Sequence, residues 1–99
     1  MAYKLRFHEL AWAEWQKLDG SIQTPLKKKL LERLEQPRVP AAALSGMADC
    51  YKIKLRQAGY RLIYRVDDDV VTVSVIAVGK RDKLAAYTTA GQRLSDQIK

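Results

Sequence analysis

Basic side chains alternate with apolar ones in the middle of the chain, in a pattern suited to binding phosphate groups. Residues 51–56 read Tyr-Lys-Ile-Lys-Leu-Arg. Because successive side chains of a β-strand point to opposite faces, Lys52, Lys54 and Arg56 are expected to share one face. Like charges on one face repel each other, so such a face is costly unless it is exposed or meets an anion. We interpret this anion as RNA phosphate.

The composition indicates one small basic domain. The chain has 99 residues, a hydrophobic fraction of 47%, a net charge of +7 and a sequence pI of about 9.7. A surplus of positive charge this large suggests a polyanion or an acidic protein as partner. We therefore expect a single domain, residues 1–99, with one modest core.

The sequence offers little for a disulfide, a metal or a membrane. One cysteine, Cys50, excludes an internal disulfide, and together with one histidine, His8, it cannot form a zinc site. We expect no metal and no cofactor. No apolar run has the length of a signal-peptide core or of a membrane span, so we expect a soluble cytoplasmic protein that does not bind membranes.

The first part of the chain is expected to supply a strand and two helices. Residues 3–7 alternate as a short edge strand, and residues 8–18 show helical spacing of apolar residues. A second helix is expected over residues 21–36, with an apolar stripe of Ile22, Leu26, Leu30 and Leu34 that Leu31 widens. Pro25 lacks an amide donor and would fit best as the first helical residue, after a Thr24 cap.

The rest of the chain is expected to supply three antiparallel strands and a terminal helix. After a loop at residues 37–49, with a helical turn near residues 41–44, the strands should follow one another. Their expected ranges are 51–56, 60–66 and 70–78, joined by turns at 57–59 and 67–69. From Lys80 onward the apolar spacing changes to that of a helix.

This order of elements predicts an α+β fold. The N-terminal strand and a helical hairpin would pack on one face of a small, mainly antiparallel four-stranded sheet, followed by a C-terminal helix. The other sheet face would then be cationic and concave. The side chains expected to converge there are Lys52, Lys54, Arg61 and Arg81.

Several motifs, taken in order, resemble those of the RelE toxin family of bacterial toxin–antitoxin systems. The segments that carry the resemblance are Met1-Ala2-Tyr3, Lys27-Lys28-Lys29-Leu30, Gly46-Met47, Asp49-Cys50-Tyr51-Lys52-Ile53-Lys54-Leu55-Arg56, Gly59-Tyr60-Arg61-Leu62 and Val78-Gly79-Lys80-Arg81. The likeness covers nearly the whole chain, and this succession is far more specific than any one motif. The chain departs from close relatives at Ser45, where they carry arginine, and at Ala48, where proline is usual.

The resemblance implies a RelE/ParE-like fold and a metal-independent mRNA interferase. Such an endoribonuclease depends on the ribosome, cuts mRNA in the A site and inhibits translation in a stress response. A cognate RelB-like antitoxin would neutralise it, 16S rRNA would bind it, and operator DNA would be reached, for co-repression, only through the antitoxin complex. The catalytic positions implied are Lys52, Lys54, Arg61, Arg81 and Tyr87. We assign RNA or phosphate binding to Lys52, Lys54, Arg56, Arg61, Arg65, Lys80, Lys27 and Lys28.

Cleavage of RNA by its own 2′-hydroxyl needs a base, cations beside the phosphate and an acid for the departing 5′-oxygen. Histidine is the usual proton shuttle at neutral pH, but His8 lies far in sequence from the basic cluster and we interpret it as structural or exposed. Neighbouring cations favour a phenolate on Tyr87 and lower a lysine pKa, so the base is Tyr87 or Lys54. The acid and phosphate-binding roles fall to Arg81, Lys52 and Arg61.

Two other classes of function stay open. Related ParE toxins share the fold, act on gyrase and lack this catalytic set, so a toxin with another target is one alternative. A non-catalytic basic module that binds RNA or protein is the other, because alternating lysines on a strand are more often a solvated face. The presence of all five catalytic residue types favours the nuclease.

Overall fold

The computed structural model describes residues 2–44, 46–56 and 58–80. The elements in chain order are β1 (Lys4–Phe7), α1 (Glu9–Gln16), α2 (Gly20–Glu35), a 3₁₀ turn η1 (Pro40–Ala42), β2 (Cys50–Leu55), β3 (Tyr60–Asp67) and β4 (Thr72–Lys80). The expected terminal helix lies outside the described residues, as do Ser45, Arg81 and Tyr87.

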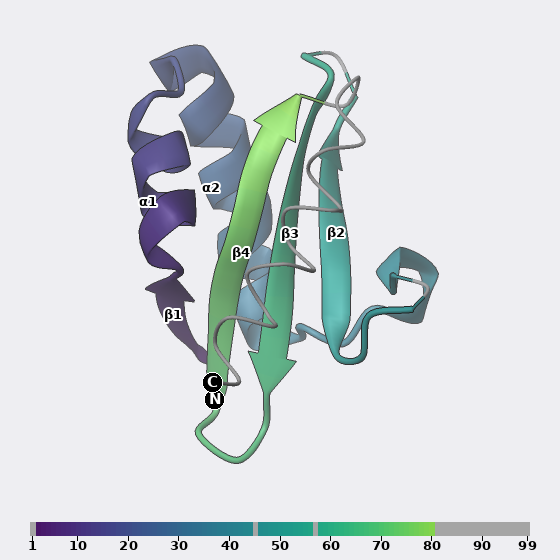
Figure 1. The fold of residues 1–99 in the computed structure, drawn as a ribbon. Helices are drawn as coiled ribbons and strands as arrows, with labels where there is room; N and C mark the ends of the chain where they lie inside the picture. The colour runs from purple at the N-terminus through teal and green to yellow at the C-terminus, as the bar shows by residue number, and fades with distance from the viewer. Residues whose placement is uncertain (1, 45, 57, 81–99) are drawn as a thin grey trace.

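The strands form one mixed sheet in the order β1-β4-β3-β2 (Figure 1). β1 runs parallel to β4, whereas β2, β3 and β4 are antiparallel neighbours. The expected α+β arrangement is confirmed, and so is the edge position of the first strand. The lysine-bearing strand β2 forms the other edge, so among the described residues it has a strand neighbour on one side only.

Both helices pack on one face of the sheet (Figure 1). The predicted stripe of α2 is buried there, with Leu26, Leu30 and Leu34 in one cluster with strand residues such as Ile53. The prediction that Leu31 widens this stripe is wrong, because Leu31 lies about 100° around the helix from Leu30 and is 49% exposed. In the described part of the chain, no helix is long and apolar enough to cross a membrane.

The helix α2 begins at Gly20, one residue before the expected range, and the suggestion that Pro25 is the first helical residue is wrong. Asp19 is the N-cap, and its carboxylate accepts hydrogen bonds from the Ser21 hydroxyl and, at 3.3 Å, from the Ser21 amide. The first turn is regular helix from Gly20, and Pro25 lies inside the helix. A capping carboxylate satisfies a free amide and interacts favourably with the helix dipole, which helps to offset the amide that proline lacks.

The turn between β3 and β4 lies later than expected. Val70 and Val71 belong to this turn rather than to a strand; they are 56% and 44% exposed, and Val71 has a φ of +49°. The Asp67 carboxylate accepts a hydrogen bond from the Asp69 amide at 3.0 Å. This local bond starts the turn at the acidic run, and the two valines complete it before β4 begins.

The sheet face opposite the helices was expected to be cationic. The structure shows that its centre is apolar. Ile63, Ile76 and Ala77 are buried in this centre, and Leu44 and Met47 from the loop before β2 pack against them. The register between β3 and β4 shifts after Ile63, where Ile63 pairs with Ala77. The basic residues of this face therefore lie around an apolar centre.

Arg38 connects three segments of the chain: the loop before β2, β2 itself and the turn after β3. Its guanidinium donates to the Asp68 carboxylate at 2.7 and 3.1 Å, to Asp49 at 3.0 Å and to the Tyr51 hydroxyl at 3.3 Å. The Tyr3 hydroxyl donates to the other Asp68 oxygen at 2.7 Å. The bonds from Tyr3 and then from Arg38 lower the pKa of the Asp68 carboxyl group.

We expect an Asp68→Asn variant to be less stable than the wild type at neutral pH, with the difference lost in acid. A lowered native pKa means that the ionised carboxylate contributes stability above the ordinary aspartate pKa. That contribution disappears as the pH falls through the native pKa. Urea unfolding in steps from neutral pH to about pH 2 measures the difference in unfolding free energy.

Asp69→Asn is the matched control for this prediction. Asp69 lies in the same turn, and among the described residues no hydrogen bond to its carboxylate is found. Its unfolding free energy should therefore follow the wild type at every pH. A difference between Asp68→Asn and the wild type that stays constant with pH would contradict the role given to the charge.

Candidate phosphate-binding and catalytic site

Three basic side chains meet on one face of the hairpin formed by β2 and β3. The strand register pairs Lys54 with Arg61 and Lys52 with Ile63. Residues directly opposite each other in an antiparallel pair have Cβ atoms about 5 Å apart and point to the same face. Lys52, Lys54 and Arg61 therefore form one cationic cluster, in which the shared face of Lys52 and Lys54 follows from their alternation in the sequence.

A tight turn holds the two strands in this register. Gly59 has a φ of +69°, a left-handed conformation that glycine adopts without steric cost. Its amide donates to the Arg56 carbonyl at 3.3 Å. At this end of the hairpin lies a hollow of about 320 Å³ whose walls include Lys54, Arg56 and Arg61. These walls carry the charge that a phosphate diester requires.

The pKa of Lys54 is lowered from that of an ordinary lysine. The charge of Lys52 is the largest cause, followed by loss of solvation and by the charges of Arg61 and Arg56. Each of these causes favours the neutral amine over the ammonium ion. A neutral amine can accept a proton, so the cluster supplies one group with the character of a general base.

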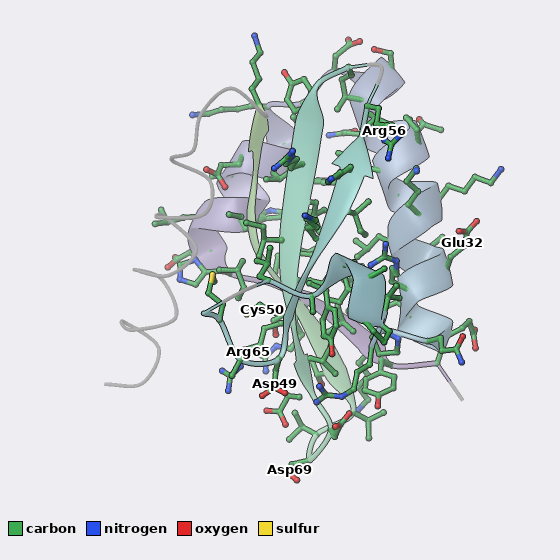
Figure 2. The ribbon with its side chains drawn as sticks, turned by 90° about the vertical axis from the view of Figure 1, so that its right-hand side faces the viewer. Glu32, Asp49, Cys50, Arg56, Arg65 and Asp69 are labelled. Atoms are coloured by element: carbon green, nitrogen blue, oxygen red, sulfur yellow. The ribbon has the colours of Figure 1, made fainter. Side chains whose placement is uncertain are left out.

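A groove of about 480 Å³ lies between α2 and β2. It is lined by Lys29, Glu32, Arg33, Ala41, Lys52, Ile53, Lys54 and Arg56. Two cations of α2 thus face the lysines of the strand, and Figure 2 labels Glu32 on the helix and Arg56 at the upper end of the strand.

Sequence reasoning missed the contribution of Lys29 and Arg33 to this groove. It assigned phosphate binding to Lys27 and Lys28, which are exposed on α2 but do not line the groove. The available signal was the spacing of Lys29 and Arg33, because residues four apart lie on the same face of a helix. Only the packing of α2 beside β2 shows which helix face meets the strand.

Other predicted site residues lie apart from the cluster. Arg65 is four residues beyond Arg61 on β3, about 13 Å along the strand. Figure 2 shows Arg65 toward the lower end of the sheet and Arg56 at its upper end. Lys80 pairs with Tyr60 on the side of the sheet that faces the helices. Arg81 and Tyr87 lie outside the described residues.

The strand β4 ends at Lys80, the last residue that the structure describes. Its pairing with β1 ends where Phe7 lies beside Val75. Beyond that point α1 replaces the missing strand neighbour, since the Glu14 carboxylate accepts a hydrogen bond from the Val78 amide at 3.2 Å. This bond satisfies a backbone donor that would otherwise lack a partner strand, and it fixes the last part of β4.

Two other groups with catalytic potential have structural roles. His8 is the N-cap of α1, and its Nδ1 accepts a hydrogen bond from the Leu10 amide at 3.2 Å. Cys50 is buried, and burial raises the pKa of its thiol to about 11, so the thiol stays protonated. Within residues 2–44, 46–56 and 58–80, no group of three or more His, Cys, Asp or Glu side chains could hold a metal ion.

Comparison with known proteins gives consistent matches over most of the chain. The family model described as "ParE toxin of type II toxin-antitoxin system, parDE" matches residues 5–85. The chain is 54% identical over 94 residues to the mRNA interferase toxin RelE of Escherichia coli strain K12, which covers 95% of this chain and 99% of that protein. The same identity and coverage hold for the mRNA interferase RelE of Shigella flexneri.

Solved structures match in the same way. A mutant of E. coli toxin RelE in the free state has a TM-score of 0.89 and 53% identity, over 95% of this chain and 99% of that chain. A chain of the intact E. coli RelBE toxin–antitoxin complex has a TM-score of 0.79 and 58% identity, over 80% of this chain and 96% of that chain.

Proposed function

The chain belongs to the RelE family of mRNA interferase toxins, and we propose that this endoribonuclease cleaves messenger RNA in the ribosomal A site and thereby inhibits translation. The observation that carries the proposal is the pairing of Lys54 with Arg61 in a cluster that lowers the lysine pKa. Fixed cations stabilise charge on the phosphate in the transition state, and a lysine whose pKa is lowered gives up its proton more readily than an ordinary lysine and so can serve as the base. No cofactor is needed for this chemistry.

In the proposed reaction the 2′-hydroxyl of one nucleotide attacks the adjacent phosphorus. Lys54 accepts the hydroxyl proton while Lys52 and Arg61 hold the phosphate oxygens. The bond from O2′ to phosphorus forms as the bond to the 5′-oxygen breaks, which leaves a 2′,3′-cyclic phosphate and a 5′-hydroxyl. Arg81, by its place in the family motif, would protonate the departing oxygen or stabilise its charge, and Tyr87 is the alternative base.

The weakness of these groups as acids and bases is the reason that we include the ribosome. Lysine, arginine and tyrosine have ordinary pKa values of about 10 or higher, so none matches histidine as a proton shuttle at neutral pH. Most of the acceleration must then come from orientation of the substrate and from charge stabilisation. A ribosome that holds the mRNA in its A site, with 16S rRNA against the basic surface, would supply that orientation.

A RelB-like antitoxin is the partner that we propose for neutralisation. The name of the E. coli RelBE complex describes a toxin bound to its antitoxin, and the chain matches that structure over 80% of its length. The net charge of +7 suits a partner with an acidic surface. Through this complex, and only through it, the protein would reach operator DNA and co-repress its operon in the cytoplasm.

One experiment tests the proposed function against its rivals. The wild type and an Arg81→Ala variant are expressed in bacteria without antitoxin, and mRNA 5′ ends are mapped. We expect growth arrest with cuts in phase with codons in the wild type, and neither in the variant. Growth arrest in both strains without mRNA cuts, accompanied by DNA damage, would instead identify a gyrase poison. Absence of toxicity in both would identify a non-catalytic binding module.

A further inference from the structure

Arg33 joins α2 to the backbone of the lysine-bearing strand. From the fourth turn of the helix, its Nη1 donates to the Lys52 carbonyl at 3.3 Å and to the Tyr64 hydroxyl at 2.9 Å. The guanidinium carbon lies 5.9 Å from the centre of the Tyr64 ring, within the range of a cation–π interaction. One side chain therefore contacts both strands of the β2–β3 hairpin.

The Lys52 carbonyl lies at the edge of the sheet, where no described strand supplies a hydrogen-bond donor on the outer side of β2. β2 is an edge strand, and an edge strand leaves a row of backbone groups without a strand partner. Near the start of β2 the loop covers this edge, since the Leu44 amide donates to the Cys50 carbonyl at 3.0 Å. Two residues further along, Arg33 takes the place of the loop and binds Lys52.

Tyr64 gives Arg33 a rigid anchor. Its side chain is fully buried, its ring stacks on Tyr51 with centroids 5.7 Å apart, and its hydroxyl donates to the Pro37 carbonyl at 2.6 Å. Burial, stacking and the hydrogen bond to Pro37 restrict the movement of the Tyr64 phenol. The guanidinium that is hydrogen-bonded to this phenol is therefore held in place as well. The Lys52 carbonyl is in turn held at one distance from α2.

We propose that Arg33 is a positioning residue for the cleavage reaction: it fixes the free edge of β2 at Lys52 and so sets the spacing of the two lysines that face the scissile phosphate. This inference rests on the proposed function. Lys52 and Lys54 lie on a strand with no outer strand neighbour in the described part of the chain, and small displacements of catalytic groups are costly, up to about 100-fold for 1 Å. The Arg33 charge also lies beside the groove, so the test must separate position from charge.

The test compares Arg33→Met and Arg33→Lys with the wild type in single-turnover cleavage of a ribosome-bound mRNA. Methionine keeps the aliphatic part of the side chain and loses both hydrogen bonds. Lysine keeps the positive charge on a shorter side chain but lacks the planar guanidinium group. We expect kcat to fall by about tenfold or more in both variants. KM should stay within about twofold of the wild-type value, and the loss of kcat should not depend on the salt concentration. Melting temperatures show that the assayed protein is folded, and Arg33→Lys replaces Arg33→Met if the latter is unstable.

Lys29→Met is the matched control, because Lys29 lines the same groove from the same face of α2. We expect it to raise KM in a salt-dependent way and to leave kcat close to that of the wild type. If Arg33→Met behaves like Lys29→Met, or if Arg33→Lys restores kcat fully, Arg33 is a phosphate contact and the inference is overturned. If the wild type itself leaves the ribosome-bound mRNA uncut, the proposed function fails and the inference fails with it.

Discussion

Replacement of Lys54 by alanine is expected to slow mRNA cleavage by about 10²–10⁴-fold at neutral pH, the usual cost of losing a general base. The variant lacks the amine that accepts the 2′-hydroxyl proton but keeps Lys52 and Arg61 to bind phosphate. The loss should therefore appear in kcat, with little change in KM. Single-turnover cleavage of an mRNA with a defined codon in the A site measures both constants.

The pH dependence of kcat separates Lys54 from the other candidate base. Because neighbouring cations lower the Lys54 pKa, wild-type kcat should rise with pH and level off below 10.5, the value for an ordinary lysine. A Tyr87→Phe variant should keep this rise, and Lys54→Ala should lose it. The opposite result, with Lys54→Ala keeping the wild-type rate and profile and Tyr87→Phe inactive, would assign the base to Tyr87.

An Arg61→Ala variant is expected to lose about 10²–10³-fold in kcat, as when one fixed donor to a charged transition state is removed. Arg61 faces Lys54 across the hairpin and is also one of the cations that lower its pKa. The variant should therefore show a second effect, a shift of the kcat profile to higher pH. Arg61→Lys keeps the charge without the two-pronged hydrogen bonding and should be intermediate in kcat and close to the wild type in pH profile.

Arg65→Ala is the matched control for Arg61→Ala. Arg65 is the same residue type on the same strand and the same sheet face, but it pairs with Cys50 at the far end of the hairpin. We expect little change in kcat and no shift of the pH profile. Equal losses in the two variants would mean that overall positive charge, rather than the position opposite Lys54, drives the reaction.

The hairpin that carries the cluster could be predicted from the sequence because its signals are local. Alternation of apolar and basic residues sets the two faces of β2 and β3, and Gly59 sets the turn and thus the register. The partners Lys54 and Arg61 follow from that register alone. Leu31 and Val70 were misplaced for a different reason: an apolar residue type does not tell whether its position faces the core.

The groove between α2 and β2 could not be predicted, because it depends on how two elements distant in sequence pack together. Spacing places Lys29 on the same helix face as Arg33, but nothing local tells whether this face or that of Lys27 or Lys28 meets β2, since all three are exposed lysines of one helix. To predict the contact of Arg33 with Lys52 and Tyr64, one must know how α2 packs against the edge of the sheet. Such contacts are set by tertiary packing, for which a single sequence carries no periodic signal.

The parallel pairing of β1 with β4 has a consequence for how the chain is made. β1 leaves the translating ribosome before the other described strands, yet its strand neighbour among the described residues is β4, the last of them, where Lys4 lies beside Thr72. Contacts between such remote segments slow folding, because the intervening loop must close before they form. The nascent polypeptide therefore cannot complete this sheet until β4 has left the ribosome, long after β1 has emerged.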